Sequence, residues 1–197
     1  YSIINEDYKE KGNPDLKHTV ADNIDLRYEF FPKSSEQFMV GLFYKNIQDP
    51  IEYGLLNEGQ DTYYKPMNFG DAKNLGMEVD VMKYFNWFGI KANYTHSKVT
   101  TDKRIMEGSE VKSVRQSRPL FGQAAHVANL SLLFKETRHG WEGQVSASYT
   151  GKRLSDISNW YEDDIWEDGY AQLDASIEKS FKNGISIFGK ASNLLDI

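Results

Sequence analysis

The chain has 197 residues, with 29 Asp and Glu against 23 Lys and Arg, a formal net charge of -6 and no cysteine. The acidic balance argues against a general nucleic-acid binder, and the lack of cysteine excludes disulfides, cysteine zinc sites and thiol enzymes. The longest apolar run, Phe38–Tyr44, is far shorter than the roughly 20 residues of a membrane-spanning helix. The chain opens at Tyr1 without a signal-like segment, so we expect it to be processed or to be part of a longer polypeptide.

Alternation of apolar and polar residues with period two recurs eight times and predicts eight β-strands. In chain order these strands fall at residues 23–30, 38–45, 76–81, 88–95, 128–135, 141–150, 171–178 and 185–192. The first is typical, because its apolar residues fall on one face and its polar residues on the other. The apolar face has Ile24, Leu26, Tyr28 and Phe30, and the polar face has Asn23, Asp25, Arg27 and Glu29.

The connections between the predicted strands alternate strictly between short and long. Short turns fall near residues 32–37, 84–87, 137–140 and 182–184, and long polar loops at 48–66, 101–123 and 154–169. A soluble sandwich also alternates, but it has no reason to keep its long loops at one end. Outer-membrane barrels do, with short periplasmic turns and long extracellular loops. We therefore predict an all-β fold: an antiparallel transmembrane β-barrel segment of about eight meandering strands.

Each predicted strand then has one lipid-facing side and one side that faces a wet lumen. Aromatic residues gather toward the strand ends, where rings with a polar tip favour the membrane interface. The residues expected to touch lipid include Leu42, Ile90, Leu132, Val145 and Ile177. The residues expected to face the lumen include Arg27, Glu78, Asp80, Lys91, Glu142, Asp174 and Glu178.

Two alternative folds keep the same alternation. In a soluble β-sandwich, the apolar faces would pack against a second layer of the same molecule. In a closed eight-strand barrel, the last strand would pair with the first. The segment from Tyr1 to His18 is too polar for a strand, and Ile197 is not an aromatic terminus, which disfavours the closed barrel.

Four segments resemble the barrels of TonB-dependent outer-membrane receptors, in the family's order. Gly12-Asn13-Pro14-Asp15-Leu16-Lys17 resembles a Gly-Asn-Pro-acidic-Leu-Lys signature, and the segment from Asn68 to Glu78 resembles an Asn-x-Gly-x-Ala…Gly-x-Glu strand start. The segment from Arg118 to Gln123, with Ala128-Asn129-Leu130, is similar to an Arg-Pro-Leu-x-Gly-Gln…Asn element of the Bacteroidetes-like branch. Asn193-Leu194-Leu195-Asp196 resembles the element before the last extracellular loop.

The resemblance implies that residues 1–197 are a partial receptor barrel without the plug domain and the last strand. It places the long loops outside the cell, in the bacterial outer membrane. The implied function is active import of a scarce, bulky ligand, such as an iron chelate, haem, cobalamin or a glycan, with energy from TonB. The implied partners are the rest of the receptor chain, TonB through the missing plug, the lipid bilayer, lipopolysaccharide and the small-molecule or glycan ligand, without nucleic acid.

The sequence contains no catalytic constellation, and we expect neither an enzyme nor a cofactor. The four histidines are scattered without metal-ligand spacing, so no metal site is predicted. Acidic and aromatic residues gather in the predicted extracellular loop at 160–169, where the candidate ligand contacts are Trp160, Tyr161, Asp163, Asp164 and Trp166. The loop at 101–123 is basic, and its candidates for attracting an anionic ligand are Arg104 and Arg115.

Each candidate loop also has a plainer interpretation. The acidic loop suits a solvated segment whose charges keep it away from lipid, and the basic loop suits contact with lipopolysaccharide phosphates. For the chain as a whole, the alternatives to a transport receptor are a small outer-membrane barrel or adhesin without transport, and a soluble ligand-binding β-sandwich.

Overall fold

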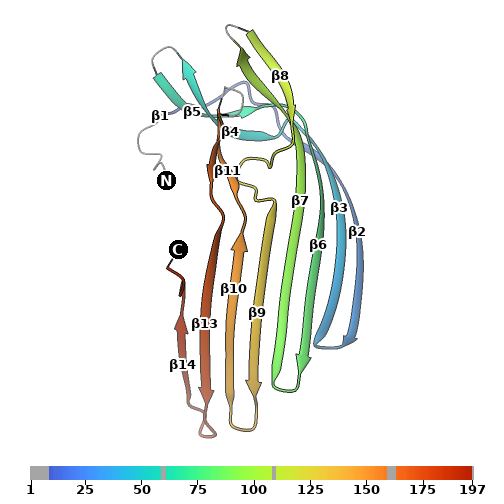
Figure 1. The fold of residues 1–197 in the computed structure, drawn as a ribbon, viewed down its shortest axis with the longest axis vertical. Helices are drawn as coiled ribbons and strands as arrows, with labels where there is room; N and C mark the ends of the chain where they lie inside the picture. Colours follow the sequence, from blue (N-terminus) through green and yellow to red (C-terminus); the bar gives the residue numbers. More distant parts are fainter. Residues whose placement is uncertain (1–8, 59–60, 108–109, 159–162, 197) are drawn as a thin grey trace.

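The computed structural model describes residues 9–58, 61–107, 110–158 and 163–196, which form two β-sheets (Figure 1). No helix within these ranges is long and apolar enough to cross a membrane. In chain order, the larger sheet contains β2 (Val20–Lys33), β3 (Glu36–Gln48), β6 (Ala72–Phe85), β7 (Phe88–Glu107), β8 (Glu110–Gln116), β9 (His126–Glu136), β10 (Trp141–Thr150), β13 (Tyr170–Ser180) and β14 (Ser186–Ala191). Adjacent strands of this sheet pair antiparallel in the order β14-β13-β10-β9-β7-β6-β3-β2. β8 pairs with the last part of β7, from Thr101 to Glu107.

Short turns and long connections alternate along the larger sheet, which confirms the predicted antiparallel meander. Two to five residues join β2 to β3, β6 to β7, β9 to β10 and β13 to β14. These turns lie together at one end of the molecule, the short-turn end, and the long connections lie at the other, the long-loop end (Figure 1). Asn86, Gly140 and Gly184 adopt positive φ angles in three of the turns, a conformation that Gly and Asn tolerate best.

The long connections are not the irregular polar loops that the sequence predicts. The connection at 101–123 forms the end of β7 together with β8, whereas the other two join the N-terminal segment in a second sheet at the long-loop end, in the order β1-β5-β4-β11-β12. Its strands are β1 (Lys9–Glu10), β4 (Ile51–Glu58), β5 (Asp61–Asn68), β11 (Arg153–Ser158) and β12 (Ile165–Glu167). Outside the larger sheet these segments still carry backbone donors and acceptors, and pairing between strands provides their hydrogen-bond partners.

Two smaller expectations are also corrected. The polar segment before Ala21 was predicted to hold no strand, yet Lys9 and Glu10 pair in parallel with Tyr63 and Tyr64. The predicted strands were also too short, since β7 continues to Glu107 and pairs there with β8. Strand pairing with a neighbour, rather than local alternation, sets these limits.

The larger sheet is an open wall. Its edges, β2 and β14, lie on opposite sides of the molecule, and no pairing joins them within the described ranges (Figure 1). The closed eight-strand barrel is therefore wrong for the part of the chain that the structure describes. An unpaired edge would leave backbone groups without partners in hydrocarbon, so both edges require further strands there.

The apolar face of the wall is exposed. The five side chains predicted to touch lipid are exposed: Leu42 by 53%, Ile90 by 37%, Leu132 by 52%, Val145 by 45% and Ile177 by 54%. No second layer of strands or helices covers them in the described ranges (Figure 1). A contiguous apolar surface of this extent marks a membrane or protein contact rather than a water-facing surface. The soluble sandwich, which needs a second layer, is therefore ruled out for these residues.

The buried apolar core lies instead at the long-loop end. Phe69, Leu154 and Ile157 are almost fully buried, and Met67 and Phe121 pack against them. This cluster joins the smaller sheet to the segment that precedes β9. The molecule therefore combines an open sheet, whose apolar face is exposed, with a small packed core at the long-loop end.

Placing a charge on the apolar face should weaken folding into a bilayer. In the complete receptor, Leu132→Arg should lower the free energy of unfolding from phospholipid vesicles by about 2–4 kcal/mol, measured by denaturant titration, because Arg at mid-bilayer faces hydrocarbon. The matched control is Ser131→Arg, one residue away on the polar face, which should have a much smaller effect. Equal losses for the two variants would contradict the assignment of the faces.

Candidate functional site

The polar face of the wall carries all seven residues predicted to face the lumen. They are Arg27, Glu78, Asp80, Lys91, Glu142, Asp174 and Glu178, and the strand registers place them opposite the exposed apolar face. One row illustrates the alignment: Lys91 lies opposite Ser131, Ser131 opposite Ser146, and Ser146 opposite Asp174. The Ser131 and Ser146 hydroxyls are hydrogen-bonded at 3.0 Å. In this row the polar surface continues across β7, β9, β10 and β13.

Charges on the polar face are partly compensated. Glu142 and Glu178 lie directly opposite each other on β10 and β13, an arrangement that is unfavourable for like charges. Lys135, opposite Glu142 on the other side, forms an ion pair with it. Asp174 accepts hydrogen bonds from Gln172 Nε2 at 3.0 Å and from the Asn193 backbone N–H at 2.9 Å. The charged groups of this face thus find protein partners as well as water.

A buried ion pair holds the smaller sheet against the wall. Arg118 donates through both terminal nitrogens to Glu52, at 2.9 and 3.1 Å, and both side chains are almost completely buried. Glu52 also accepts the backbone N–H of Phe121 at 2.8 Å. β4 and the segment 118–123 are therefore joined by three hydrogen bonds to one carboxylate. In the sequence, Arg118 is recognisable only as part of a family signature, and no pattern marks Glu52.

The other signature residues form a second set of links at the long-loop end. The Asn68 side chain accepts the Lys17 backbone N–H at 2.9 Å and donates to the carbonyls of Lys17 and Asp49, at 3.1 and 2.7 Å. Asp71 accepts the Asp49 backbone N–H at 3.1 Å, and Asn13 donates to the Pro66 carbonyl at 3.0 Å. Two motifs far apart in the sequence therefore contact each other and fix the ends of β5 and β3.

An aromatic and acidic corner of the smaller sheet is a candidate contact surface that sequence analysis did not identify. The rings of Tyr53 and Tyr64 stack with centroids 5.0 Å apart, and Phe121 lies 5.7 Å from Tyr53. Burial raises the pKa of Asp156, although hydrogen bonds from Ser155 and Tyr64 act in the opposite direction. Burial, followed by the charge of Asp156, raises the pKa of Tyr64 to about 12. Tyr64 therefore remains a neutral hydroxyl at physiological pH.

The predicted ligand contacts of the acidic segment are only partly described. Trp160 and Tyr161 lie outside the described residues. Asp163 is exposed, whereas Asp164 accepts the Ser158 backbone N–H at 3.0 Å and so stabilises the connection from β11 to β12. Trp166 is half-exposed, and the ammonium of Lys152 lies 4.9 Å from its ring centre.

The two predicted basic contacts lie on a different element. Arg104 is part of β7 and Arg115 part of β8, so both belong to the extension of the larger sheet rather than to the smaller one. The side chain of Arg104 lies outside the described side chains, and Arg115 is exposed. Of the candidates that lie in described strands, Trp166 belongs to the smaller sheet, and Arg104 and Arg115 belong to the larger one. Within the described ranges, no group of three His, Asp or Glu side chains is placed to hold a metal ion.

Comparison with known proteins identifies the family. A family model described as TonB dependent receptor-like, beta-barrel, matches residues 3–194. The chain belongs to this family. The predicted family is thus confirmed, while its Bacteroidetes-like branch remains a prediction. No curated protein sequence matches the chain.

Solved structures of TonB-dependent receptors share the fold. The copper transporter OprC has a TM-score of 0.67 and 12% identity, over 95% of this chain and 28% of its own. The FrpB iron transporter from Neisseria meningitidis (F3-3 variant) has a TM-score of 0.62 and 13% identity, over 93% and 28%. The siderophore receptor PirA from Acinetobacter baumannii has a TM-score of 0.61 and 16% identity, over 94% and 29%. The chain therefore spans less than a third of each of these structures, which are transport receptors and not enzymes.

Removing one partner of the buried ion pair should release the smaller sheet from the wall. In the complete receptor, Arg118→Met leaves the Glu52 carboxylate buried without its counter-charge, which should destabilise β4 locally by about 3–5 kcal/mol. The measurement is hydrogen exchange of peptides covering Ile51–Glu58. The double variant Arg118→Met, Glu52→Leu should recover most of the protection, and failure to do so would show that packing rather than charge is responsible.

The buried carboxyl of Asp156 should make β11 less stable as the pH rises. Its pKa is raised in the folded state, so the folded chain binds more proton than the unfolded chain from the usual value of 3.8 up to the folded value. Stability is therefore lost as the pH rises through this window. Asp156→Asn should increase the hydrogen-exchange protection of β11 at pH 7 and abolish this dependence, after correction for intrinsic exchange rates. Asp163→Asn, at an exposed carboxylate nearby, is the control and should change neither.

Proposed function

We propose that this chain is part of the wall of an outer-membrane receptor that imports a scarce, bulky ligand with energy from TonB. The observation that carries the proposal is the two-faced wall, apolar and exposed on one side and polar across neighbouring strands on the other. Such a wall suits a barrel with lipid outside and water inside. In this arrangement residues 1–197 are a partial barrel, and the plug domain and remaining strands belong to the rest of the receptor.

The proposed orientation places the short turns in the periplasm and the smaller sheet outside the cell. Short periplasmic turns and long extracellular connections are the rule in such barrels. The seven polar-face residues from Arg27 to Glu178 then line the lumen. Capture falls to the long-loop end, where a packed sheet presents side chains more rigidly than a free loop.

A metal ion or metal chelate is the ligand class that we favour. An iron transporter, a siderophore receptor and a copper transporter are among the structures with this fold. The proposed capture surface combines the aromatic corner at Tyr53 and Tyr64 with the predicted contacts Trp160, Tyr161, Asp163, Asp164 and Trp166. Arg104 and Arg115 would attract an anionic chelate electrostatically. A non-transporting barrel or adhesin would share the wall but would not need a plug or TonB.

Uptake by a deletion strain tests the proposal. Deleting the gene for the complete receptor should abolish TonB-dependent uptake of one ligand class when ferric siderophores, haem, copper, cobalamin and oligosaccharides are supplied separately as labelled compounds. The wild-type gene should restore uptake in a strain with TonB but not in one without it. Unchanged uptake of all the compounds, or uptake that is independent of TonB, would contradict active import and favour a barrel with another role.

A further inference from the structure

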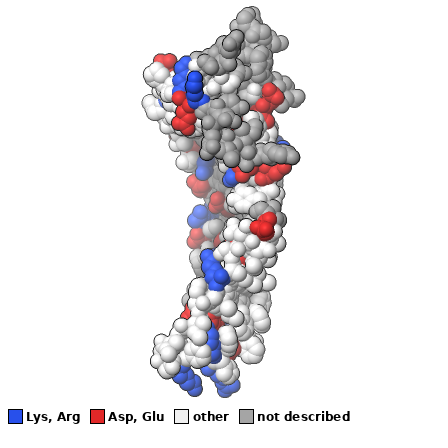
Figure 2. Space-filling view, turned by 90° about the vertical axis from the view of Figure 1, so that its left-hand side faces the viewer, with Lys and Arg blue, Asp and Glu red and all other residues white. Residues whose placement is uncertain are grey.

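A basic pocket lies between two neighbouring turns at the short-turn end. Residues 137–140 and 179–182 enclose about 580 Å³, and the cationic side chains that line it are Arg138, Lys179 and Lys182, together with His139. The Ser180 backbone N–H donates to the Gly140 carbonyl at 2.8 Å, and the Lys179 ammonium donates to the His139 carbonyl. These contacts hold the two turns side by side. Lys and Arg gather at this end of the molecule (Figure 2).

The acidic side chains on the adjoining strands are already engaged elsewhere. Glu136 accepts the backbone N–H groups of Arg138 and His139 at 2.8 and 2.9 Å, and its carboxylate also contacts the His139 ring at 2.9 Å. Glu142 is paired with Lys135 on the polar face, and Glu178 accepts the Ser180 hydroxyl at 3.2 Å. None of these carboxylates lines the pocket. The pocket therefore presents positive charge to an incoming ligand.

An aromatic depression continues from the basic pocket onto the apolar face. Lys179 and Phe181 line both, and the second depression, of about 430 Å³, is completed by residues such as Trp141, Ile177 and Ile187. The Lys179 ammonium lies 4.9 Å from the ring centre of Trp141 and 5.4 Å from that of Phe181. A cation held between two rings at the edge of an apolar surface is typical of the level of lipid headgroups.

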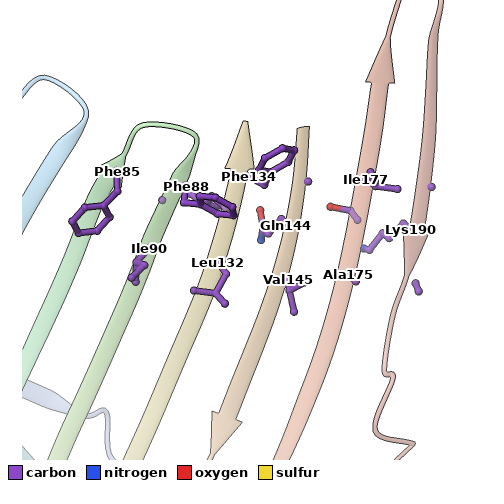
Figure 3. A pocket seen from close by; sticks show the side chains of 16 residues that line it. Phe85, Phe88, Ile90, Leu132, Phe134, Gln144, Val145, Ala175, Ile177 and Lys190 are labelled. Carbon is purple, nitrogen blue, oxygen red and sulfur yellow. The ribbon is translucent and has the colours of Figure 1, made fainter. Parts of the chain in front are cut away.

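A longer groove of about 750 Å³ continues from this depression across β14, β13, β10, β9 and the start of β7 (Figure 3). Ile177 and Gly189 border both hollows. The groove exists because small residues interrupt the bulky apolar rows: Gly143 follows Phe134 in one row, and Ala175 follows Val145 in the next. A Cβ placed on Gly189 would meet only Ile177, at 3.8 Å, so the space above it is open.

We propose that these three connected hollows, here called the lipid groove, bind one anionic phospholipid. The phosphate lies in the basic pocket, where Arg138 and Lys182 donate to its oxygens, and an acyl chain lies over Gly189 and Gly143. Basic pockets beside apolar surface recognise anionic headgroups in this way. Charge complementarity favours this occupant over a zwitterionic lipid. The inference rests on the proposed function, since it places the short-turn end in the phospholipid leaflet of the outer membrane.

Native mass spectrometry of the purified, delipidated receptor tests the lipid groove. Dioleoyl phosphatidylglycerol should bind more tightly than dioleoyl phosphatidylethanolamine. Arg138→Gln with Lys182→Gln should weaken phosphatidylglycerol binding by roughly 25-fold, at about fivefold for each lost cation. Gly189→Leu should weaken it at least about tenfold, because the new side chain displaces two or more buried methylenes of the acyl chain.

Matched variants serve as controls for charge and volume. Lys73→Gln with Lys98→Gln removes two exposed cations near the long-loop end, and Gly41→Leu adds the same side chain to the polar face; both should bind phosphatidylglycerol as the wild type does. Equal binding of the two phospholipids, or no loss in Arg138→Gln with Lys182→Gln, would overturn the proposal. Displacement of phosphatidylglycerol by lipopolysaccharide from this site would also overturn it, because the short-turn end would then face outward.

Ligand uptake separates this inference from the proposed function. Variants in the lipid groove should lose lipid binding while the receptor in cells still imports its ligand, since none of the substituted residues lies on the polar face. Both proposals are supported if deleting the gene abolishes uptake and the purified wild-type receptor binds phosphatidylglycerol selectively. Absence of any TonB-dependent uptake, combined with selective phosphatidylglycerol binding, would remove the transport function and leave the lipid groove standing.

Discussion

Unbroken antiparallel pairing of the long strands is the constraint on which the rest of the structure depends. β6 and β7, for example, pair without interruption from Ala72 opposite Thr101 to Phe85 opposite Phe88. Hydrocarbon offers no hydrogen-bond partner for a backbone N–H or carbonyl group. Each strand must therefore form hydrogen bonds with the strands on both sides. Regular pairing in turn forces side chains to alternate between faces. The separation of apolar and polar faces follows from the need to pair the backbone.

The two ends of the wall are built by different means. At the short-turn end a few residues reverse the chain, and the turns add basic side chains next to apolar surface. At the long-loop end the connections pair with each other, bury a core around Phe69 and Leu154, and fix themselves through the Arg118–Glu52 ion pair. Burial of an ion pair adds little net stability, but it strongly disfavours arrangements that separate the partners. The smaller sheet is thus held in one position on the wall.

This division of labour suits a receptor that must bind on one side and stay in the membrane on the other. The long-loop end keeps its position through its buried core and through side-chain hydrogen bonds such as those of Asn68 with Lys17 and Asp49. The apolar face of the wall has no partner for an added charge, whereas the polar face carries charged neighbours. Contacts with lipid then need sites of their own, and the small residues Gly143 and Gly189 provide one without disturbing the strand pairing.

The sequence by itself determined which face of each long strand is apolar, because the period of a strand is two in any β-fold; Leu132 and Ser131 could be assigned before any contact was known. It also located the short turns and the family. Only the tertiary structure decided the strands at the long-loop end. In β4 the pattern is inverted, with Glu52 buried and Ile51 exposed, since the partner of Glu52 lies 66 residues later in the chain. Local alternation carries no information about such a distant partner. The corner at Tyr53 and Asp156 could not be predicted for the same reason, because its residues come from segments far apart in the sequence.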